Sequence, residues 1–274
     1  MSSTNKRTIH VRRLLPYHGR MRVFSHTCSN TEIVCALDAA ECLIGVDDDS
    51  DHPPEIVATL PKLGRDLDLD VAAVIALKPD LVLSSLTVPG HERIVDALEA
   101  AGIRTLVCDP QSLEDVYGDV LRIAAALGVA QRGERLVTQM RERMQPVERT
   151  ARPRVLLEWW PKPVIVPARR SWATDLVELA GGINPWGAMD AKSKPLEPHE
   201  AIAASPDIVV MSWCGVAEAN YRAEVVRRRP GWRAVPAVAH NRIFPITEAW
   251  LGRPGPRLMD GYDALKRHID GFTS

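Results

Sequence analysis

The sequence states one strand-like phrase twice, and this repetition limits the folds open to the chain. Residues 75–85 read IALKPDLVLSS, and residues 202–213 read IAASPDIVVMSW. Each copy places a Pro-Asp pair before a continuous run of apolar residues rich in Val, Ile and Leu. Such a run is typical of a parallel strand that is buried on both faces of its sheet. Two copies therefore predict two α/β units built on one plan.

Two further pairs of segments support this duplication. RVFS at Arg22 matches RVLL at Arg154, and TLVCD around Leu106 matches IFPIT around Phe244. The three pairs occur in the same order along the chain. The alternative is that strand-helix-strand units share this pattern in general. Between the two sets, apolar residues recur at helical spacing from Gln131 to Arg149, which predicts one long helix.

These patterns predict an α/β protein with two Rossmann-like lobes, each on a parallel sheet, joined by one long linking helix. The expected boundaries are 21–128 for the first lobe, 129–152 for the linking helix and 153–274 for the second lobe. A length of 274 residues suits two domains, since a domain takes roughly 100–200 residues.

Composition excludes several classes of protein. The formal net charge is −1, whereas a nucleic-acid protein needs a clear basic excess on one face. No apolar run approaches the roughly 18 residues that would span a bilayer, and no signal peptide is visible in the basic first segment. The five cysteines form no CxxC pair, which favours a reducing compartment. We expect a monomer that binds no nucleic acid.

The loops that follow the strands are the candidate binding site, because open parallel sheets bind ligands beyond the carboxyl ends of their strands. All seven tryptophans lie in the second half of the chain, and large aromatic faces suit a flat ligand. Arg170 and Arg253 suit a carboxylate or phosphate, although exposed salt bridges are equally open to them. The candidate ligand-binding residues are Cys28, Ser29, Asn30, His52, Arg65, Leu86, Thr87, Trp159, Trp160, Arg170, Trp172, Trp186, Cys214, Trp250 and Arg253. Trp213 and Trp232 are expected to be core residues.

Cys28 and Cys214 each follow a strand, one in each half, and are expected to face one another. With His26 or His52 they are candidates for a soft metal site, but their spacing matches no zinc pattern and ordinary loop cysteines remain the alternative. A cytoplasmic enzyme or sensor using Cys28, Cys214 and Glu158 is the other reading. No GxSxG, Walker or GxGxxG motif stands in the required context. We therefore expect a protein that is not an enzyme and requires no cofactor.

From about residue 21 to 270 the order of segments resembles a known family. The carrying segments include RVFSHTCSNTEIVCAL, IGVDDDSDHPPE, LPKLGRDLDLD, TDLVELAGGINPW and VPAVAHNRIFPITEAWLGRPGPRLMDG. They resemble the class III periplasmic binding proteins that serve ABC importers of cobalamin, ferric siderophores and haem, and the SD-x-PP loop is most similar to the cobalamin binders. The resemblance implies a cobalamin-like corrinoid as ligand, with a ferric siderophore or haem as the alternative. It also implies an importer permease as partner and an extracytoplasmic location, although without a signal peptide a cytoplasmic location stays open.

Overall fold

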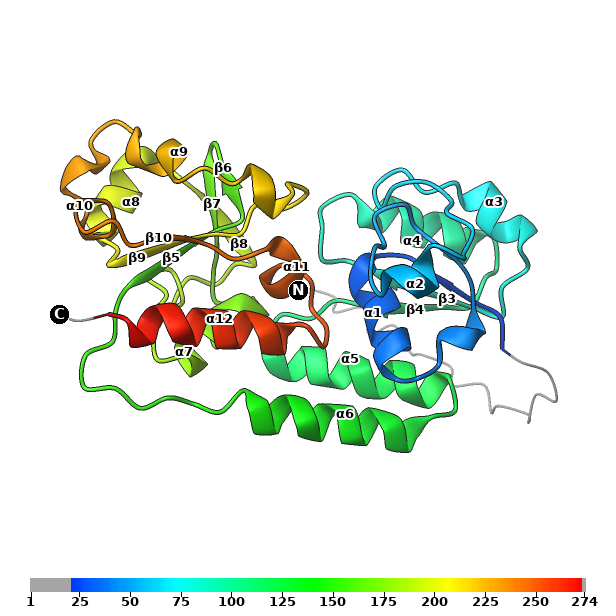
Figure 1. Ribbon diagram of the computed structural model, residues 1–274. Helices are drawn as coiled ribbons and strands as arrows, with labels where there is room; N and C mark the ends of the chain where they lie inside the picture. The colour runs from blue at the N-terminus through cyan, green and yellow to red at the C-terminus, as the bar shows by residue number, and fades with distance from the viewer. Residues whose placement is uncertain (1–20, 273–274) are drawn as a thin grey trace, which may run out of the picture.

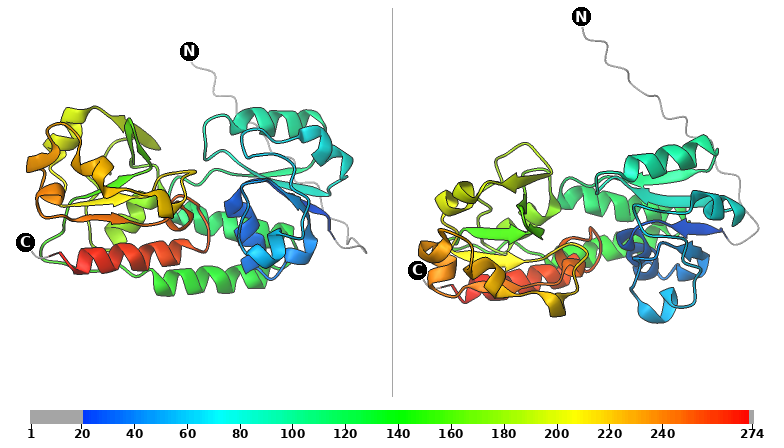
Figure 2. Two further views of the ribbon diagram at one scale, coloured as in Figure 1. Left: turned by 45° about the horizontal axis from the view of Figure 1, so that its top comes forward. Right: turned by 90° about the horizontal axis from the view of Figure 1, so that it is seen from above.

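The computed structural model describes residues 21–272. The first segment, on which the signal-peptide expectation rests, lies outside these residues. Two lobes stand side by side above a shared layer of helices (Figures 1 and 2). The predicted two-lobed α/β architecture is therefore confirmed.

The first lobe is a four-stranded parallel sheet in the order β2-β1-β3-β4. Its strands are β1 Val23–Ser25, β2 Leu43–Val46, β3 Leu81–Ser85 and β4 Thr105–Cys108, and its helices are α1 Cys28–Ala36, α2 Pro54–Val57, α3 Val71–Ala76 and α4 His91–Ala100. Side chains alternate along the strands, as strand geometry requires. Val23 therefore packs toward α1, whereas Phe24 packs toward α3 and α4.

The second lobe departs in part from the prediction. Its parallel sheet has three strands in the order β10-β9-β5, and a separate antiparallel sheet, β6-β7-β8, adjoins it. The strands are β5 Val155–Glu158, β6 Trp160–Pro161, β7 Val164–Pro167, β8 Ser193–Leu196, β9 Ile208–Met211 and β10 Ile243–Pro245. The helices are α7 Trp172–Leu179, α8 Pro198–Ala204, α9 Ala223–Arg227, α10 Pro236–Ala239, α11 Glu248–Leu251 and α12 Leu258–Asp270. The segment expected as one strand, RVLLEWW, thus divides between two sheets.

The repeated Pro-Asp phrase has the same structural role in both lobes. The Asp80 carboxylate accepts a hydrogen bond from the backbone N–H of Arg22 at 2.8 Å, and Asp207 does the same for Arg154 at 2.8 Å. In return, Arg22 O accepts from the backbone N–H of Asp80, and Arg154 O from that of Asp207. The matched strands also occupy matched places, β1-β3-β4 in one sheet and β5-β9-β10 in the other. The sequence repetition is a structural duplication.

We expect Asp80→Ala and Asp207→Ala to destabilise the protein by similar amounts. Each removes a hydrogen bond between an aspartate carboxylate and the backbone N–H just before the neighbouring strand. One such hydrogen bond to a charged group contributes about 1.5–3 kcal/mol, and less where water reaches it. Urea unfolding of both variants measures this. Asp68→Ala, in an exposed loop, serves as the control. A loss of unfolding free energy in only one variant would contradict the equivalence of the two aspartates.

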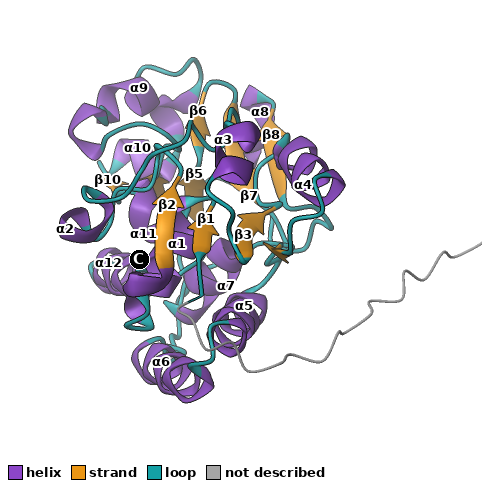
Figure 3. Ribbon diagram, turned by 90° about the vertical axis from the view of Figure 1, so that its right-hand side faces the viewer, coloured by secondary structure: helices purple, strands orange, loops and turns teal. Residues whose placement is uncertain are grey.

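The helices α5 Leu113–Ala126 and α6 Ala130–Arg143 lie side by side beneath the first lobe (Figure 3). They extend toward α7 and α12 of the second lobe, and one continuous core cluster includes side chains from all four helices and from both parallel sheets. The expected helix from Gln131 to Arg149 is too long. It ends at Arg143 because Pro146 disfavours a helical conformation at Gln145. Within residues 21–272, every helix is too short or too polar to cross a bilayer.

Candidate functional site

The carboxyl ends of the strands in the two parallel sheets point toward one another (Figure 1). Within residues 21–272, side chains near these ends form ion pairs with the opposite lobe at two places. Both contacts are ionic, and both join residues far apart in the sequence.

The first contact is made by Lys192, which precedes β8. Its ammonium group donates to Asp109 Oδ1 at 2.6 Å and to Leu86 O at 3.1 Å. Asp109 follows β4 and Leu86 follows β3, so one second-lobe cation is bound by two strand ends of the first lobe. The pair is partly exposed, with 40% of the Lys192 side chain open to solvent.

The second contact is a buried cluster around Arg253, in the loop between α11 and α12. Its guanidinium donates to Asp51 at 2.5 and 3.2 Å and to Glu32 at 3.2 Å. Arg257 donates through Nε to Glu32 Oε2 at 2.9 Å, and through Nη2 to the other oxygen. Glu32 lies on α1 and Asp51 follows β2, so this cluster also joins the two lobes.

The two contacts lie at opposite edges of the first sheet. Asp51 follows the edge strand β2, and Asp109 follows the other edge strand β4. Three strand spacings of about 4.8 Å separate these edges by about 14 Å. The ends of β1 and β3 lie between them and carry Cys28 and Thr87. This strip between the two ionic contacts is the candidate binding site.

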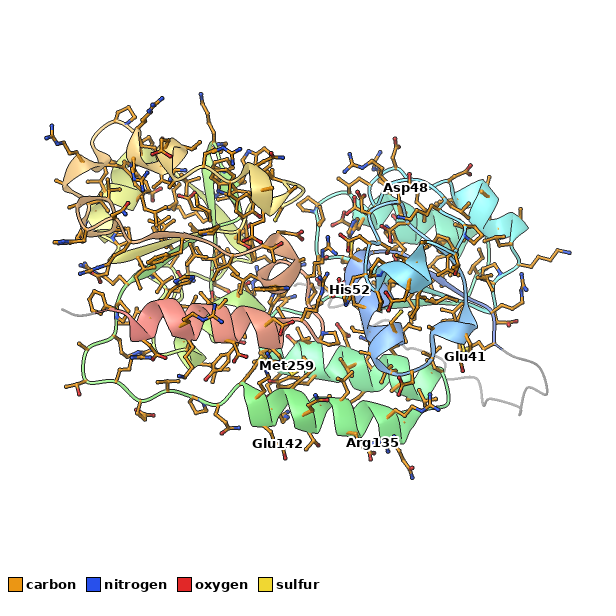
Figure 4. All side chains as sticks on the ribbon, viewed as in Figure 1. Glu41, Asp48, His52, Arg135, Glu142 and Met259 are labelled. Atoms are coloured by element: carbon orange, nitrogen blue, oxygen red, sulfur yellow. The ribbon has the colours of Figure 1, made fainter. Side chains whose placement is uncertain are left out.

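The first-lobe candidates at this strip differ in burial and in hydrogen bonding. Ser29 and Asn30 are buried, and the Asn30 amide donates to His26 O and Ser84 O at 2.9 and 3.1 Å. Cys28 is half-buried and its thiol donates to Asp49 O at 2.9 Å. His52 lies on the first lobe on the side toward the second (Figure 4). Leu86 and Thr87 are half-buried.

The tryptophan candidates do not form one platform. Trp159 and Trp172 approach each other with ring centroids 6.1 Å apart. Trp172 is a core residue whose indole N–H donates to Leu251 O at 2.8 Å, and Trp250 packs against the same cluster. The indole N–H of Trp159 is buried and finds no partner among residues 21–272. Trp160 is 41% exposed.

Trp186 is placed elsewhere, in the core cluster on the other face of the second-lobe sheet. Trp213 and Trp232 belong to the same cluster, and this confirms their expected core role. The sequence pattern does not distinguish these core tryptophans from those near the strip, because both kinds occur in loops of this part of the chain.

Two arginine candidates form ion pairs near the surface with carboxylates of their own lobe. Arg65 donates to Asp49 at 3.1 and 3.4 Å, and Arg170 lies 3.3 Å from Asp190. Exposed pairs of this kind contribute little to stability. Arg65 lies on the first lobe, where Asp49 leads into the loop that carries Asp51, and Arg170 lies beside α7 of the second lobe.

His26 is not arranged as a metal ligand. Both of its ring nitrogens are engaged, Nδ1 with Ser84 Oγ at 2.8 Å and Nε2 with Asp66 O at 2.7 Å. Within the described residues, the structure assembles no group of three or more metal-ligating side chains. The set His26, Cys28, His52 and Cys214 therefore forms no metal site by itself.

The residues of the enzyme alternative have structural partners. Glu158 is fully buried and bonded to the Arg229 guanidinium and to the indole N–H of Trp213. Burial raises the pKa of the Cys28 thiol, which disfavours the thiolate that nucleophilic catalysis requires. Cys214 is exposed on the second lobe. Arg253 is close enough to act on the charge of both thiols.

The structure also shows hollows outside this strip. One of about 530 Å³ lies at the base, between the 146–152 segment, the start of α5 and α7. Another of about 420 Å³ lies on the second lobe between the β6-β7 hairpin, α8 and α9.

Sequence reasoning missed most of the residues that join the lobes: Glu32, Asp51, Asp109, Lys192 and Arg257. Asp51 and Asp109 lie in loops that follow predicted strands, so position alone favoured them. Glu32 and Lys192 carry no local signal, because their partners are far away in the sequence.

Comparison with known proteins places this geometry in a family. The profile described as "Periplasmic binding protein" matches residues 23–249. A Bacillus subtilis (strain 168) protein named as an uncharacterized ABC transporter substrate-binding lipoprotein, YvrC, is 29% identical, over 90% of this chain and 79% of its own length. A Vibrio parahaemolyticus vitamin B12-binding protein is 23% identical, over 91% of this chain and 89% of its own length.

A solved structure shows the same overall fold. The periplasmic heme-binding protein RhuT from Roseiflexus sp. RS-1, in apo form, superposes with a TM-score of 0.77 at 28% identity, over 92% of this chain and all of its own. Since the family profile spans both lobes and the strip between them, the chain belongs to the periplasmic binding protein family.

Proposed function

We propose that this protein is the substrate-binding component of an ABC importer and captures a cobalamin-like corrinoid between its lobes. The observation that carries the proposal is the strip itself, bounded by two ionic contacts at the carboxyl ends of the strands. Its family and the substrate-binding names of its relatives support the same role. An importer permease is the proposed partner.

Binding at such a strip requires no covalent chemistry. Affinity would come from burial of apolar ligand surface against Trp159 and Trp160, at about 25 cal/mol per Å². A few oriented polar groups would add to it, less the cost of ordering on association.

Haem is the second candidate ligand. The heme-binding RhuT is similar at 28% identity over nearly the whole chain, while the vitamin B12-binding relative is similar at 23%. A ferric siderophore is the third, on the same site.

Retention of a coloured ligand tests the proposal. Purified protein is mixed separately with cyanocobalamin, haemin and ferrichrome, desalted, and read by visible absorption and native mass spectrometry. We expect cyanocobalamin to be retained at one per chain. Urea-unfolded protein is the control for nonspecific adsorption, which matters most for haemin. Retention of haemin or ferrichrome alone would overturn the corrinoid assignment and keep the class, whereas retention of none would overturn the proposed function.

A further inference from the structure

The Arg253 cluster contains three carboxylates of very different exposure. The Glu32 side chain is 2% exposed, Glu248 is 20% exposed and Asp51 is 59% exposed. The Arg253 side chain itself is 13% exposed. A buried guanidinium is thus covered from the solvent side by one exposed loop carboxylate.

Only Asp51 is free to leave. Glu32 is buried and is also bound by Arg257, so its departure would leave charges unpaired in the interior, which is costly. Burial raises the pKa of Glu248, and its carboxylate lies 3.5 Å from Arg253 Nε. Asp51, in contrast, returns to water without burying any charge.

The Asp51 contact leaves Arg253 incompletely satisfied. The Nε–H of Arg253 is buried and makes no hydrogen bond among residues 21–272, and its ionic partner Glu248 stands 3.5 Å away. Asp51 occupies both Nη groups, in the two-point geometry that a guanidinium offers to any carboxylate or phosphate. An external oxyanion in the same place would keep the local charge balance unchanged.

We infer that Asp51 is an internal competitor at Arg253, and that the ligand of the inter-lobe site carries a carboxylate or phosphate group that displaces it. This inference rests on the proposed function and adds to it the chemical feature by which ligands are selected. A ligand without an oxyanion leaves Asp51 in place and gains nothing from Arg253. Arg253 is then the residue that selects ligands with an oxyanion. Asp51 determines how strongly such an oxyanion must bind in order to displace it.

Competition by Asp51 persists at neutral pH. Burial acts to raise the pKa of its carboxyl, but the hydrogen bonds and charge of Arg253, with the charges of Arg257 and His52, bring the pKa below its ordinary value. The carboxylate is therefore ionised throughout the range in which binding is measured. Mild acidification alone would therefore not remove it.

Asp51→Asn removes the competing charge from an exposed side chain, and Arg253 keeps Glu32 and Glu248 as counterions. Asp48→Asn is the matched control, because it makes the same charge change in the same loop at a carboxylate that binds Gly64 rather than Arg253. Asp48 lies at the top of the first lobe (Figure 4) and accepts from Gly64 N–H at 3.2 Å. Arg253→Gln supplies the opposite change, with circular dichroism to check its fold.

The ligand pairs differ in the oxyanion. Cyanocobalamin, which has a phosphodiester, is paired with dicyanocobinamide, which lacks it; haemin, with two propionates, is paired with haemin dimethyl ester. Titrations use the pair whose chromophore the wild-type protein retains. We expect Asp51→Asn to tighten the oxyanion-bearing member about fivefold, as removal of a modest ion pair implies, and to leave the other unchanged. Arg253→Gln should weaken only the oxyanion-bearing member, and Asp48→Asn neither.

Equal effects of Asp51→Asn on both members would overturn the inference and assign Asp51 to lobe closure, with the proposed function intact. Tightening of both members by Asp48→Asn would also overturn it, because general charge would then explain the result. If neither wild type nor Asp51→Asn retains any ligand, the proposed function is wrong and the inference falls with it.

Discussion

Glu158→Gln should destabilise the protein by about 3–5 kcal/mol, the largest effect we expect from a single substitution. The Glu158 carboxylate is fully buried, and it binds the Arg229 guanidinium through both oxygens. Arg229 is 13% exposed and lies over the Trp232 ring, 4.6 Å from its centroid. A neutral amide would leave this buried positive charge without a counterion. Urea unfolding followed by tryptophan fluorescence measures the loss.

Two further variants show whether the loss of stability comes from leaving a buried charge unpaired. Asp190→Asn breaks the ion pairs of an exposed carboxylate with Arg169 and Arg170, whose side chains are also exposed, and should cost less than about 1 kcal/mol. The double variant Glu158→Met with Arg229→Met should regain much of the stability, since replacing a whole buried pair is often neutral. If Glu158→Gln were as stable as the wild type, the Arg229 guanidinium would have to reach water in the variant. It would also reopen a chemical role for Glu158.

The duplicated architecture was predictable because its signals are local. The Pro-Asp phrase sets the start of β3 and of β9, and each aspartate binds the backbone of the strand beside it. Buried parallel strands also have a compositional signature. The antiparallel β6-β7-β8 sheet has neither a long apolar run nor a strong turn signal, and it was missed. The end of α6 at Arg143 was missed because apolar spacing continued past Pro146.

The candidate site was predictable only as a set of loops. Strand ends fall on one edge of a parallel sheet, which places Cys28 and Leu86 near one another without any knowledge of contacts. Which side chains those loops bury is decided by packing between distant segments. Trp172 and Trp186 looked alike in sequence, yet they pack in different core clusters. The ion pairs of Glu32 with Arg253 and Arg257 join residues more than two hundred positions apart.

Acidification from pH 6.5 to pH 4 should remove about 3 kcal/mol of stability through His26 alone. Burial lowers the pKa of His26 to about 4, and the charge of His91 acts in the same direction, while the Asp66 carbonyl and carboxylate act in the opposite direction. In the unfolded chain the pKa is 6.5. A lowered folded-state pKa means that the unfolded state binds the proton first. The stabilising contribution is therefore complete above pH 6.5 and is lost as the pH falls toward 4.

His26→Gln isolates this contribution. The variant loses stability at every pH because Ser84 and Asp66 O lose their imidazole partner, but the difference from wild type should shrink by about 3 kcal/mol between pH 7 and pH 4. Asp119, whose pKa burial raises to about 6, opposes the trend equally in both proteins, so it cancels in the difference. His91 packs edge-on against His26 with ring centroids 5.0 Å apart. Parallel stability curves for wild type and His26→Gln would show that His26 is not the group that titrates.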